Sequence, residues 1–497
     1  MPSSWTIAKG VARTVRGVSD VALRAGAYVA QGQDLRRGRR AAASGVLAPG
    51  DPSPPPGAAD CYDYRGVAVR RELAPLMNGE FSLGHWLDPR RGPRDAIGLP
   101  RQVLTRHVAV VGPTGAGKSA SILVPWTATA LRAGASVVAV DPGGDLLAGV
   151  AALRRHAGAL GARVATWDYT APASSVSWDW LAALHGDDEL AAASEALLGR
   201  LRPGDAQLPL RQRDDRTLRG LLEVVRATRR GATIADLLAT LQDQQALVRA
   251  RAAVAGSAGA RRLAEVAGLP AHEYGPAVST VVDALDALDR PDVRAVTDQR
   301  DLELERLFDV PTLLVVVAPR NGGRTSETLA SLMLSQVGRV LARRSGGGAG
   351  SQVLLLVDEA PRLGRRVDLE ALLSVSRRAS ASVCLAAQDV ADFGDERTRS
   401  RVLDGCGTCV ALPSASDASA RYFANRLGQR QQAAVGVATT TGAVAPQRSV
   451  TRSSAASPVL GVRELTDPPW GPRTAVVHVS TVVGRPILVD LTRRELP

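Results

Sequence analysis

A short glycine-rich segment that begins at Gly112 constrains the fold more than any other feature of the chain. It consists of Gly112-Pro113-Thr114-Gly115-Ala116-Gly117-Lys118-Ser119, which matches the phosphate-loop pattern G-x-x-x-x-G-K-[ST]. In such a loop the glycines let backbone N–H groups turn toward phosphate oxygens, and the lysine reaches the β- and γ-phosphates. Ser119 would offer its hydroxyl to Mg2+. The segment therefore predicts a nucleoside triphosphate site that takes ATP with Mg2+.

The residues on both sides of this loop support the prediction. Residues 106–111, Arg-His-Val-Ala-Val-Val, are typical of a buried parallel strand, and residues 119–132 are typical of a helix. Pro125 predicts a kink or an early end in that helix. Strand, glycine loop and helix are the context that the motif requires, because the helix N-terminus then faces the anion. A glycine-rich turn with an incidental lysine is the alternative, and this context disfavours it.

The basic residues of the chain are almost all arginine. Among the 61 Lys and Arg residues, Lys9 and Lys118 are the only lysines. A phosphate loop uses the compact ammonium group of lysine, whereas the planar fork of arginine suits a different geometry. The net charge of +12 favours a polyanionic partner, either nucleic acid or an anionic membrane surface. An aromatic content of 3% disfavours a platform that stacks single-stranded bases.

Composition divides the chain into four segments. Residues 1–58 form a basic arm with a Pro-rich linker, in which Arg36-Arg37-Gly38-Arg39-Arg40 is a candidate contact for phosphate or anionic lipid; a solvated arm is the alternative. Val- and Leu-rich runs in residues 59–182 and 301–497 indicate an α/β nucleotide-binding domain in two parts, with a mainly parallel sheet covered by helices. Residues 183–300 are helical in pattern and predict an inserted all-α domain.

Individual elements can be predicted within these segments. The expected strands are the apolar runs 108–111, 136–140, 164–167, 312–317, 353–357, 382–387, 408–412, 475–479 and 486–491. In the all-α segment, Leu218, Leu221, Leu222 and Val225 share one helix face. Thr233-Ile234-Ala235-Asp236 is a capping box that opens a helix over residues 237–248. Residues 432–457, rich in Ala, Thr, Ser and Gln, predict an exposed loop or a partly disordered insertion.

The second half of the nucleotide site is expected at the ends of two later strands. Residues 353–359, Val-Leu-Leu-Leu-Val-Asp-Glu, predict a strand that ends in two carboxylates. Asp358 would hold Mg2+ through a water, and Glu359 would orient and deprotonate the attacking water. Gln388 follows the next strand and would sense the γ-phosphate, unless it only caps that strand. Arg377 precedes the same strand and is a candidate for a role in a neighbouring subunit's site, with a solvated surface residue as the alternative.

Cysteine usage and hydropathy indicate the compartment. Four cysteines do not make a disulfide scaffold and no secretory signal is visible, so we expect the cytoplasm. Cys406 and Cys409 have the spacing of metal ligands, but no second Cys or His pair stands near them, which favours buried free thiols over zinc. No stretch approaches the ~18–20 apolar residues of a membrane-spanning helix. Any membrane association is therefore expected to be peripheral, on the cytoplasmic face.

Taken in order, the motifs resemble the TraG/TraD-like coupling proteins of type IV secretion, which are conjugative DNA-transfer ATPases. The resemblance covers about residues 80–495. It is carried by 105–108 leading into GPTGAGKS, by VVAVDPGGD at 137–145, by DEAPRLG at 358–364 and by AQD at 387–389. It implies a RecA-like P-loop core that hydrolyses ATP, assembles as a homo-hexamer around DNA and feeds a relaxase-bound strand to the secretion channel. The inserted all-α domain would select that cargo.

Two departures from the family's pattern bear on this expectation. The family usually begins with transmembrane helices, which this chain lacks, so attachment would need a partner or the basic arm. The family's Asp-Pro-Lys-Gly-Glu string is Asp141-Pro142-Gly143-Gly144-Asp145 here, so its lysine is missing. The alternatives are an FtsK/HerA-type DNA motor, a protein-secretion ATPase, and a nucleotide-gated docking adaptor that does not translocate.

Overall fold

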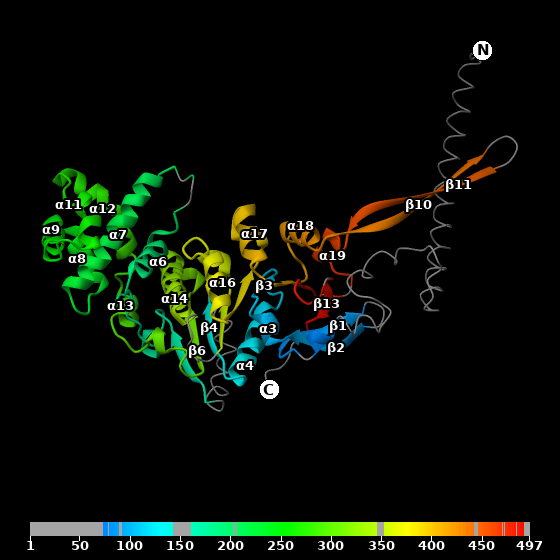
Figure 1. Cartoon of the computed structure of the whole chain (residues 1–497), viewed down its shortest axis with the longest axis horizontal. Helices are drawn as coiled ribbons and strands as arrows, with labels where there is room; N and C mark the ends of the chain where they lie inside the picture. The colour runs from blue at the N-terminus through cyan, green and yellow to red at the C-terminus, as the bar shows by residue number, and fades with distance from the viewer. Residues whose placement is uncertain are drawn as a thin grey trace, which may run out of the picture.

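A large mixed sheet forms the centre of the fold (Figure 1). The structure, a computed structural model, describes residues 73–491 apart from 78, 89–91, 143–160, 202–203, 205, 345–351, 442–445, 470, 472 and 484. Within these ranges the sheet has 11 strands in the order β2-β1-β13-β12-β9-β3-β8-β7-β4-β6-β5. The predicted basic arm, including residues 36–40, lies outside the described residues, as do Gly143, Gly144 and Asp145.

The half of the sheet from β9 to β5 is parallel throughout. Its strands are β3 (Val108–Val111), β4 (Ser136–Asp141), β5 (Arg163–Trp167), β6 (Thr312–Val317), β7 (Val353–Val357), β8 (Ser382–Ala387) and β9 (Thr408–Ala411). Apart from the first residues of β5, every position in these strands is buried. Burial of both faces explains the continuous apolar runs in the sequence. The predicted parallel α/β core is confirmed.

The other half of the sheet is antiparallel. Strand β12 (Thr474–Val479) pairs with β9, β13 (Ile487–Asp490) pairs with β12, and β1 (Phe81–Asp88) pairs with β13 and with β2 (Gly92–Leu99). The sequence predicts β12 and β13 but not β1 and β2. Phe81, Leu83 and Trp86 of β1 are buried, so this added hairpin also contributes to the core.

Helices accompany the sheet along the chain. They are α3 (Arg101–Leu104), the π-helical turn η2 (Ser119–Leu123), α4 (Val124–Arg132), α14 (Gly323–Arg344), α15 (Ala360–Leu363), α16 (Leu369–Arg378), α17 (Glu396–Asp404), α18 (Asp417–Arg426) and α19 (Val462–Thr466). Short 3-10 turns are η3 (Pro172–Ser174), η4 (Leu304–Arg306), η5 (Arg320–Gly322) and η6 (Val390–Phe393). None of the described helices is both long and apolar enough to cross a membrane.

A group of helices between β5 and β6 gathers at one end of the molecule (Figure 1). They are α6 (Asp187–Leu198), α7 (Leu208–Thr228), α8 (Ile234–Gln242), α9 (Gln244–Ala253), α10 (Ala258–Arg262), α11 (Ala264–Ala267), α12 (Ala271–Asp286) and α13 (Pro291–Thr297). The four apolar residues expected on one face, from Leu218 to Val225, are buried on α7. This group lies in the segment predicted to be an inserted all-α domain.

The predicted capping box is present at the start of α8. The Asp236 backbone N–H donates to Thr233 Oγ1 over 3.3 Å, and the Thr233 N–H donates to Asp236 Oδ2 over 3.0 Å. The prediction of a single helix over residues 237–248 is wrong, because the helix is interrupted at Asp243. The Asp243 side chain accepts from the Gln245 N–H over 2.9 Å and thereby caps a second helix, α9.

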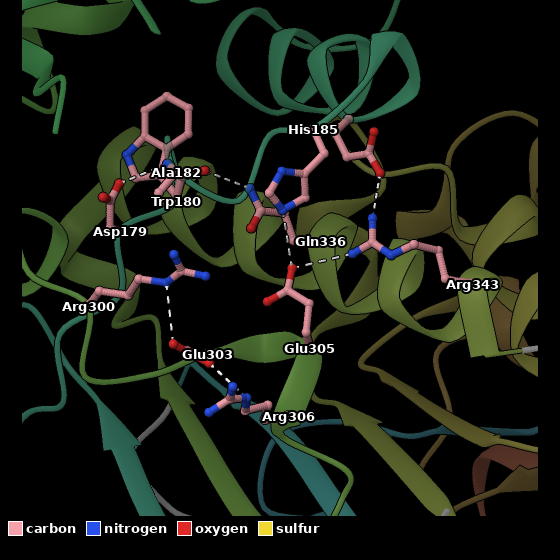
Figure 2. A network of polar contacts seen from close by, with 11 residues as sticks. Asp179, Trp180, Ala182, His185, Arg300, Glu303, Glu305, Arg306, Gln336 and Arg343 are labelled. Atoms are coloured by element: carbon pink, nitrogen blue, oxygen red, sulfur yellow. Dashed lines mark hydrogen bonds and ion pairs between the residues drawn. The ribbon is translucent and has the colours of Figure 1, made fainter. Parts of the chain in front are cut away.

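A polar network joins the start of the helical group to α14 and η4 (Figure 2). Arg343, near the end of α14, donates to Glu189 of α6 over 2.7 Å and to Glu305 of η4 over 3.4 Å. Glu305 also lies 3.8 Å from His185 Nε2, just before α6. Gln336 of α14 donates to the Trp180 carbonyl oxygen over 3.0 Å. Helix α14 is therefore tied to the connection that leads into the helical group.

Strands β10 (Gln429–Thr441) and β11 (Pro446–Pro458) form a separate antiparallel pair. Their register runs from Gln429 opposite Pro458 to Thr441 opposite Pro446. Figure 1 shows this hairpin projecting away from the sheet, at the end opposite the helical group. The prediction of an exposed loop over residues 432–457 is therefore wrong, since the backbone pairs along both arms.

Candidate active site

The parallel half of the sheet brings three predicted segments together at the carboxyl ends of its strands. The phosphate loop follows β3, Asp358 and Glu359 follow β7, and Gln388 follows β8. Strand β8 lies between β3 and β7, with Val111 opposite Ala387 and Val357 opposite Leu385. Because the carboxyl ends of parallel strands lie on the same side of the sheet, Gln388 lies between the loop and the two carboxylates. Ligands of open α/β sheets bind at this side.

The backbone of the phosphate loop requires its glycines. Gly115 and Gly117 have φ of 80° and 94°, in the left-handed region that glycine tolerates best. A Cβ on Gly112 would lie 2.4 Å from Leu412 Cβ, so only glycine fits where the loop leaves β3. Ser119 then begins η2, which continues as α4 to Arg132. Of the two effects expected of Pro125, an early end is wrong, since α4 runs on to Arg132; the change from the π-helical turn η2 to α-helix lies just before the proline.

The Lys118 ammonium group is folded into the loop and is close to both carboxylates. Its Nζ donates to the carbonyl oxygens of Gly112 over 2.6 Å and Pro113 over 3.1 Å. Burial lowers the pKa of Lys118, whereas the charges of Asp358 and Glu359 act to raise it. The two halves of the predicted site, far apart in the sequence, therefore meet around Lys118.

The two carboxylates are held differently. Asp358 is buried, and its backbone N–H donates to the Val140 carbonyl oxygen on β4 over 3.1 Å. Burial raises the pKa of Asp358, and the nearby Lys118 ammonium opposes that shift. Glu359 has a left-handed backbone with φ of 50°, and its N–H donates to Asp358 Oδ1 over 3.0 Å. A non-glycine residue pays about 1 kcal/mol or more for this conformation, which is often found at functional sites.

One oxygen of Glu359 accepts two hydrogen bonds from other strands' ends. Gln388 Nε2 donates to Glu359 Oε1, and so does Arg320 Nη2, which also forms an ion pair with it. Arg320 lies three residues after β6 and was not among the residues predicted from the sequence. Its position just past the carboxyl end of a parallel strand is the signal that could have indicated it.

The structure does not bring Arg377 into this group within one chain. Arg377 lies near the end of α16, which leads into the start of β8 rather than its end. Its Nη2 donates to the Gly405 carbonyl oxygen over 3.1 Å. Arg377 therefore lies at the amino ends of the strands, whereas Lys118 lies at their carboxyl ends. Its role toward a neighbouring subunit stays a prediction.

The donor set fits a triphosphate with a divalent cation. Asp358 and Ser119 offer oxygen ligands, which Mg2+ prefers, and Mg2+ usually completes its shell with substrate phosphates and water. Among the described residues no cluster of three or more His, Cys, Asp or Glu side chains could hold a metal, so the phosphates would have to share it. A pocket of about 330 Å³ is lined by Glu359 and Gln388 together with Arg362, Arg365 and Asp392.

The cysteine pair predicted to be buried lies away from this site. Cys406 and Cys409 are buried free thiols, as is Cys384 of β8. Burial raises the pKa of each of the three thiols. They are therefore poor nucleophiles and pack as small apolar side chains.

Comparisons with known proteins agree with this fold. A protein-family model described as "Type IV secretory system Conjugative DNA transfer" matches residues 77–466. The bacterial conjugative coupling protein TrwB without its first 70 residues is 17% identical, with a TM-score of 0.61 over 80% of this chain and 87% of that one. TrwB in complex with ADP and Mg2+ is 17% identical, with a TM-score of 0.62 over 81% and 88%.

A more distant likeness is to VirB4 of Thermoanaerobacter pseudethanolicus. It is 13% identical, with a TM-score of 0.52 over 84% of this chain and 97% of that one. A search of curated proteins found no match. At these identities the solved structures establish the fold, whereas the family model identifies the lineage.

Proposed function

Because the chain belongs to the type IV secretory system conjugative DNA transfer family, we propose that it is an ATP-hydrolysing coupling protein that brings DNA to a type IV secretion channel. The observation that carries the proposal is the meeting of Lys118, Asp358, Glu359 and Gln388 at one edge of the parallel sheet. Strand order alone places these residues together, although the sequence separates them widely.

Each residue of this group has a distinct task. The loop's backbone N–H groups and Lys118 bind the phosphates, and Gly112, Gly115 and Gly117 allow the loop its shape. Glu359 orients the attacking water and accepts its proton. Gln388, between the loop and Glu359, donates a hydrogen bond to whichever acceptor faces it, which suits a γ-phosphate sensor.

Asp358 and Ser119 would hold Mg2+, which when bound neutralises charge on the β- and γ-phosphate oxygens. Structures of TrwB, whose fold is similar, contain ADP with Mg2+ or an ATP analogue, which supports the same ligands here. Burial lowers the pKa of Lys118, and the charges of two nearby carboxylates oppose that shift. This arrangement suits an ammonium group that binds a phosphate anion.

The proposal extends to assembly and cargo. We propose a homo-hexamer around relaxase-bound DNA, in which Arg377 contacts the site of a neighbouring subunit. The net charge of +12 supports a polyanionic cargo. The helical group between β5 and β6 is the proposed cargo-selecting domain, and the junction in Figure 2 is where it would act on the core. The proposed location is the cytoplasmic face of the membrane.

ATPase measurements on the purified chain test the proposal. We expect duplex DNA to raise the rate of ATP hydrolysis, and added salt to reduce that stimulation steeply, because phosphate contacts release counterions. Lys118→Ala should hydrolyse no ATP with or without DNA. A rate that DNA leaves unchanged would remove the DNA-dependent part of the proposal. Wild-type turnover by Lys118→Ala would show that the site is wrongly placed.

A further inference from the structure

Arg320 contacts the proposed catalytic base, yet the proposed hydrolysis gives it no task. Its guanidinium donates to Glu359 Oε1, the same oxygen that accepts from Gln388. Two donors on one oxygen fix the direction in which the carboxylate points. A carboxylate that is held this way is less free to turn toward a water molecule than one that is held by Gln388 alone.

The turn that carries Arg320 is tightly built. Pro319 precedes it, and a Cβ on Gly322 would lie 2.0 Å from both Tyr169 Oη and Ser326 Oγ, which are themselves hydrogen-bonded over 2.6 Å. Gly323 has φ of 54° and begins α14. This packing leaves the backbone little freedom, so the side chain of Arg320 is presented from a fixed platform.

The Arg320 side chain is half exposed, unlike the carboxylate that it contacts. It is 51% exposed, whereas the Glu359 side chain is 10% exposed. Its charge reaches Lys118, whose pKa it acts to lower, and Asp358, whose pKa it acts to lower as well. Arg320 and Lys118 therefore lie close enough beside the phosphate loop for their positive charges to interact. A triphosphate there would compete with Glu359 for the guanidinium.

We propose that Arg320 is a positioning residue that holds Glu359 in a resting orientation and releases it when a γ-phosphate draws the guanidinium away. This proposal rests on the proposed function, since it assumes that Glu359 is the base. It names an arginine of the same chain, distinct from the predicted Arg377, and it gives the enzyme a resting state in which Glu359 is held until ATP binds.

The first test measures kcat for ATP hydrolysis without DNA. Arg320→Ala should raise this DNA-free kcat at least threefold, because the guanidinium no longer competes with the attacking water for Glu359. Arg320→Lys keeps the charge without the fork and should lie between Arg320→Ala and wild type. Arg421→Ala, which removes an exposed arginine paired with Asp417 over 2.7 Å, is the matched control. A DNA-free kcat that is unchanged or lower in Arg320→Ala would overturn the proposal.

The second test needs no nucleotide and separates this proposal from the proposed function. In a double-mutant cycle of Arg320→Ala and Glu359→Ala, we expect the shifts in melting temperature to be non-additive. Arg320→Ala should alter the melting temperature of wild type but not that of Glu359→Ala. Additive shifts would mean that the contact has no energy and would overturn the proposal. Absence of ATPase activity in the wild type would instead contradict the proposed function. The double-mutant cycle could still be interpreted, because it measures melting temperatures without nucleotide.

Discussion

Gly112, where the phosphate loop leaves β3, lies against Leu412, where the chain leaves β9. The contact is so close that a Cβ on Gly112 would be 2.4 Å from Leu412 Cβ and 3.0 Å from its Cδ1. The Leu412 backbone N–H also donates to the Val111 carbonyl oxygen over 2.8 Å. The last strand of the parallel half therefore sets the position at which the loop begins, and this relationship has a measurable consequence.

Gly112→Ala should destabilise the fold by about 1–3 kcal/mol, the usual cost of overpacking a fixed core. ATP affinity should fall as well, because the loop would have to move. Chemical denaturation and nucleotide titration measure the two effects. Gly275→Ala is the matched control: this exposed glycine of α12 has no neighbouring atom within 4 Å of an added Cβ. There alanine should change stability by less than ~1 kcal/mol, because the gain in helix propensity opposes the restriction that Pro276 places on the preceding residue. Equal stabilities for the two variants would contradict the account.

Glu359→Gln should lower ATP turnover by about 10²- to 10⁴-fold, the range expected when a general base is removed. ATP binding should persist, because Lys118 and the loop are untouched and glutamine keeps an acceptor for Arg320 and Gln388. Steady-state hydrolysis and a binding titration check the two halves. Glu370→Gln, at an exposed pair with Arg401 over 3.5 Å, should leave both quantities unchanged. Turnover within threefold of wild type would assign the base elsewhere.

Arg366→Ala should destabilise the fold by about 2–4 kcal/mol, since it leaves buried carbonyl groups without a charged donor. Arg366 is buried and donates to the carbonyl oxygens of Ala196 over 2.6 Å and Leu197 over 2.9 Å at the end of α6. Arg211→Ala is the comparison, because Arg211 bonds the next two carbonyl groups from a less buried position. Denaturant unfolding should show a larger loss in the free energy of unfolding for Arg366→Ala than for Arg211→Ala. The reverse order would contradict the expected effect of burial.

His107 should make stability depend on pH in the acid range. Its Nδ1 accepts from the Val383 N–H over 3.1 Å, so Nε2 carries the proton that is donated to the Leu373 carbonyl oxygen over 2.8 Å. Burial is the main cause that lowers the pKa of His107 from 6.5 to about 4. The unfolded chain therefore binds a proton first as pH falls, and stability that is complete above pH 6.5 is lost progressively down to pH 4.

The expected loss from His107 is about 3 kcal/mol over that window, since each pKa unit is worth ~1.4 kcal/mol. His107→Gln should lack this component, which denaturation at a series of pH values would show as a shallower slope. His272→Gln, at an exposed histidine, serves as the control. A slope unchanged by His107→Gln would contradict the tautomer and burial described here.

Much of the core could be predicted because its strands are buried on both faces. Runs such as Thr312–Val317 and Val353–Val357 have no polar face, and the structure gives them the predicted bounds. The edge hairpin of β1 and β2 escaped prediction because its sequence mixes polar, glycine and proline residues. Within the part of the chain that the structure describes, strands β10 and β11 pair only with each other, so no sheet face imposes an apolar pattern on them.

The site could be predicted only in part, for a similar reason. The phosphate loop and the Asp358-Glu359 pair are marked by local sequence. Arg320 is one arginine among many, and only the order of β6, β4 and β7 brings it to Glu359. Asp243 likewise divides a periodic helical segment by a side-chain cap that outweighs the apolar pattern around it.

Conjugative transfer by donor cells that carry Glu359→Gln tests the central claim most directly. The variant keeps the nucleotide site, the fold and every partner surface, and it removes only the proposed base. If ATP hydrolysis drives DNA to the channel, transfer frequency should fall to the level of Lys118→Ala, at equal protein amounts. Transfer at the wild-type frequency, with ATP turnover abolished, would contradict the motor and show a docking adaptor instead.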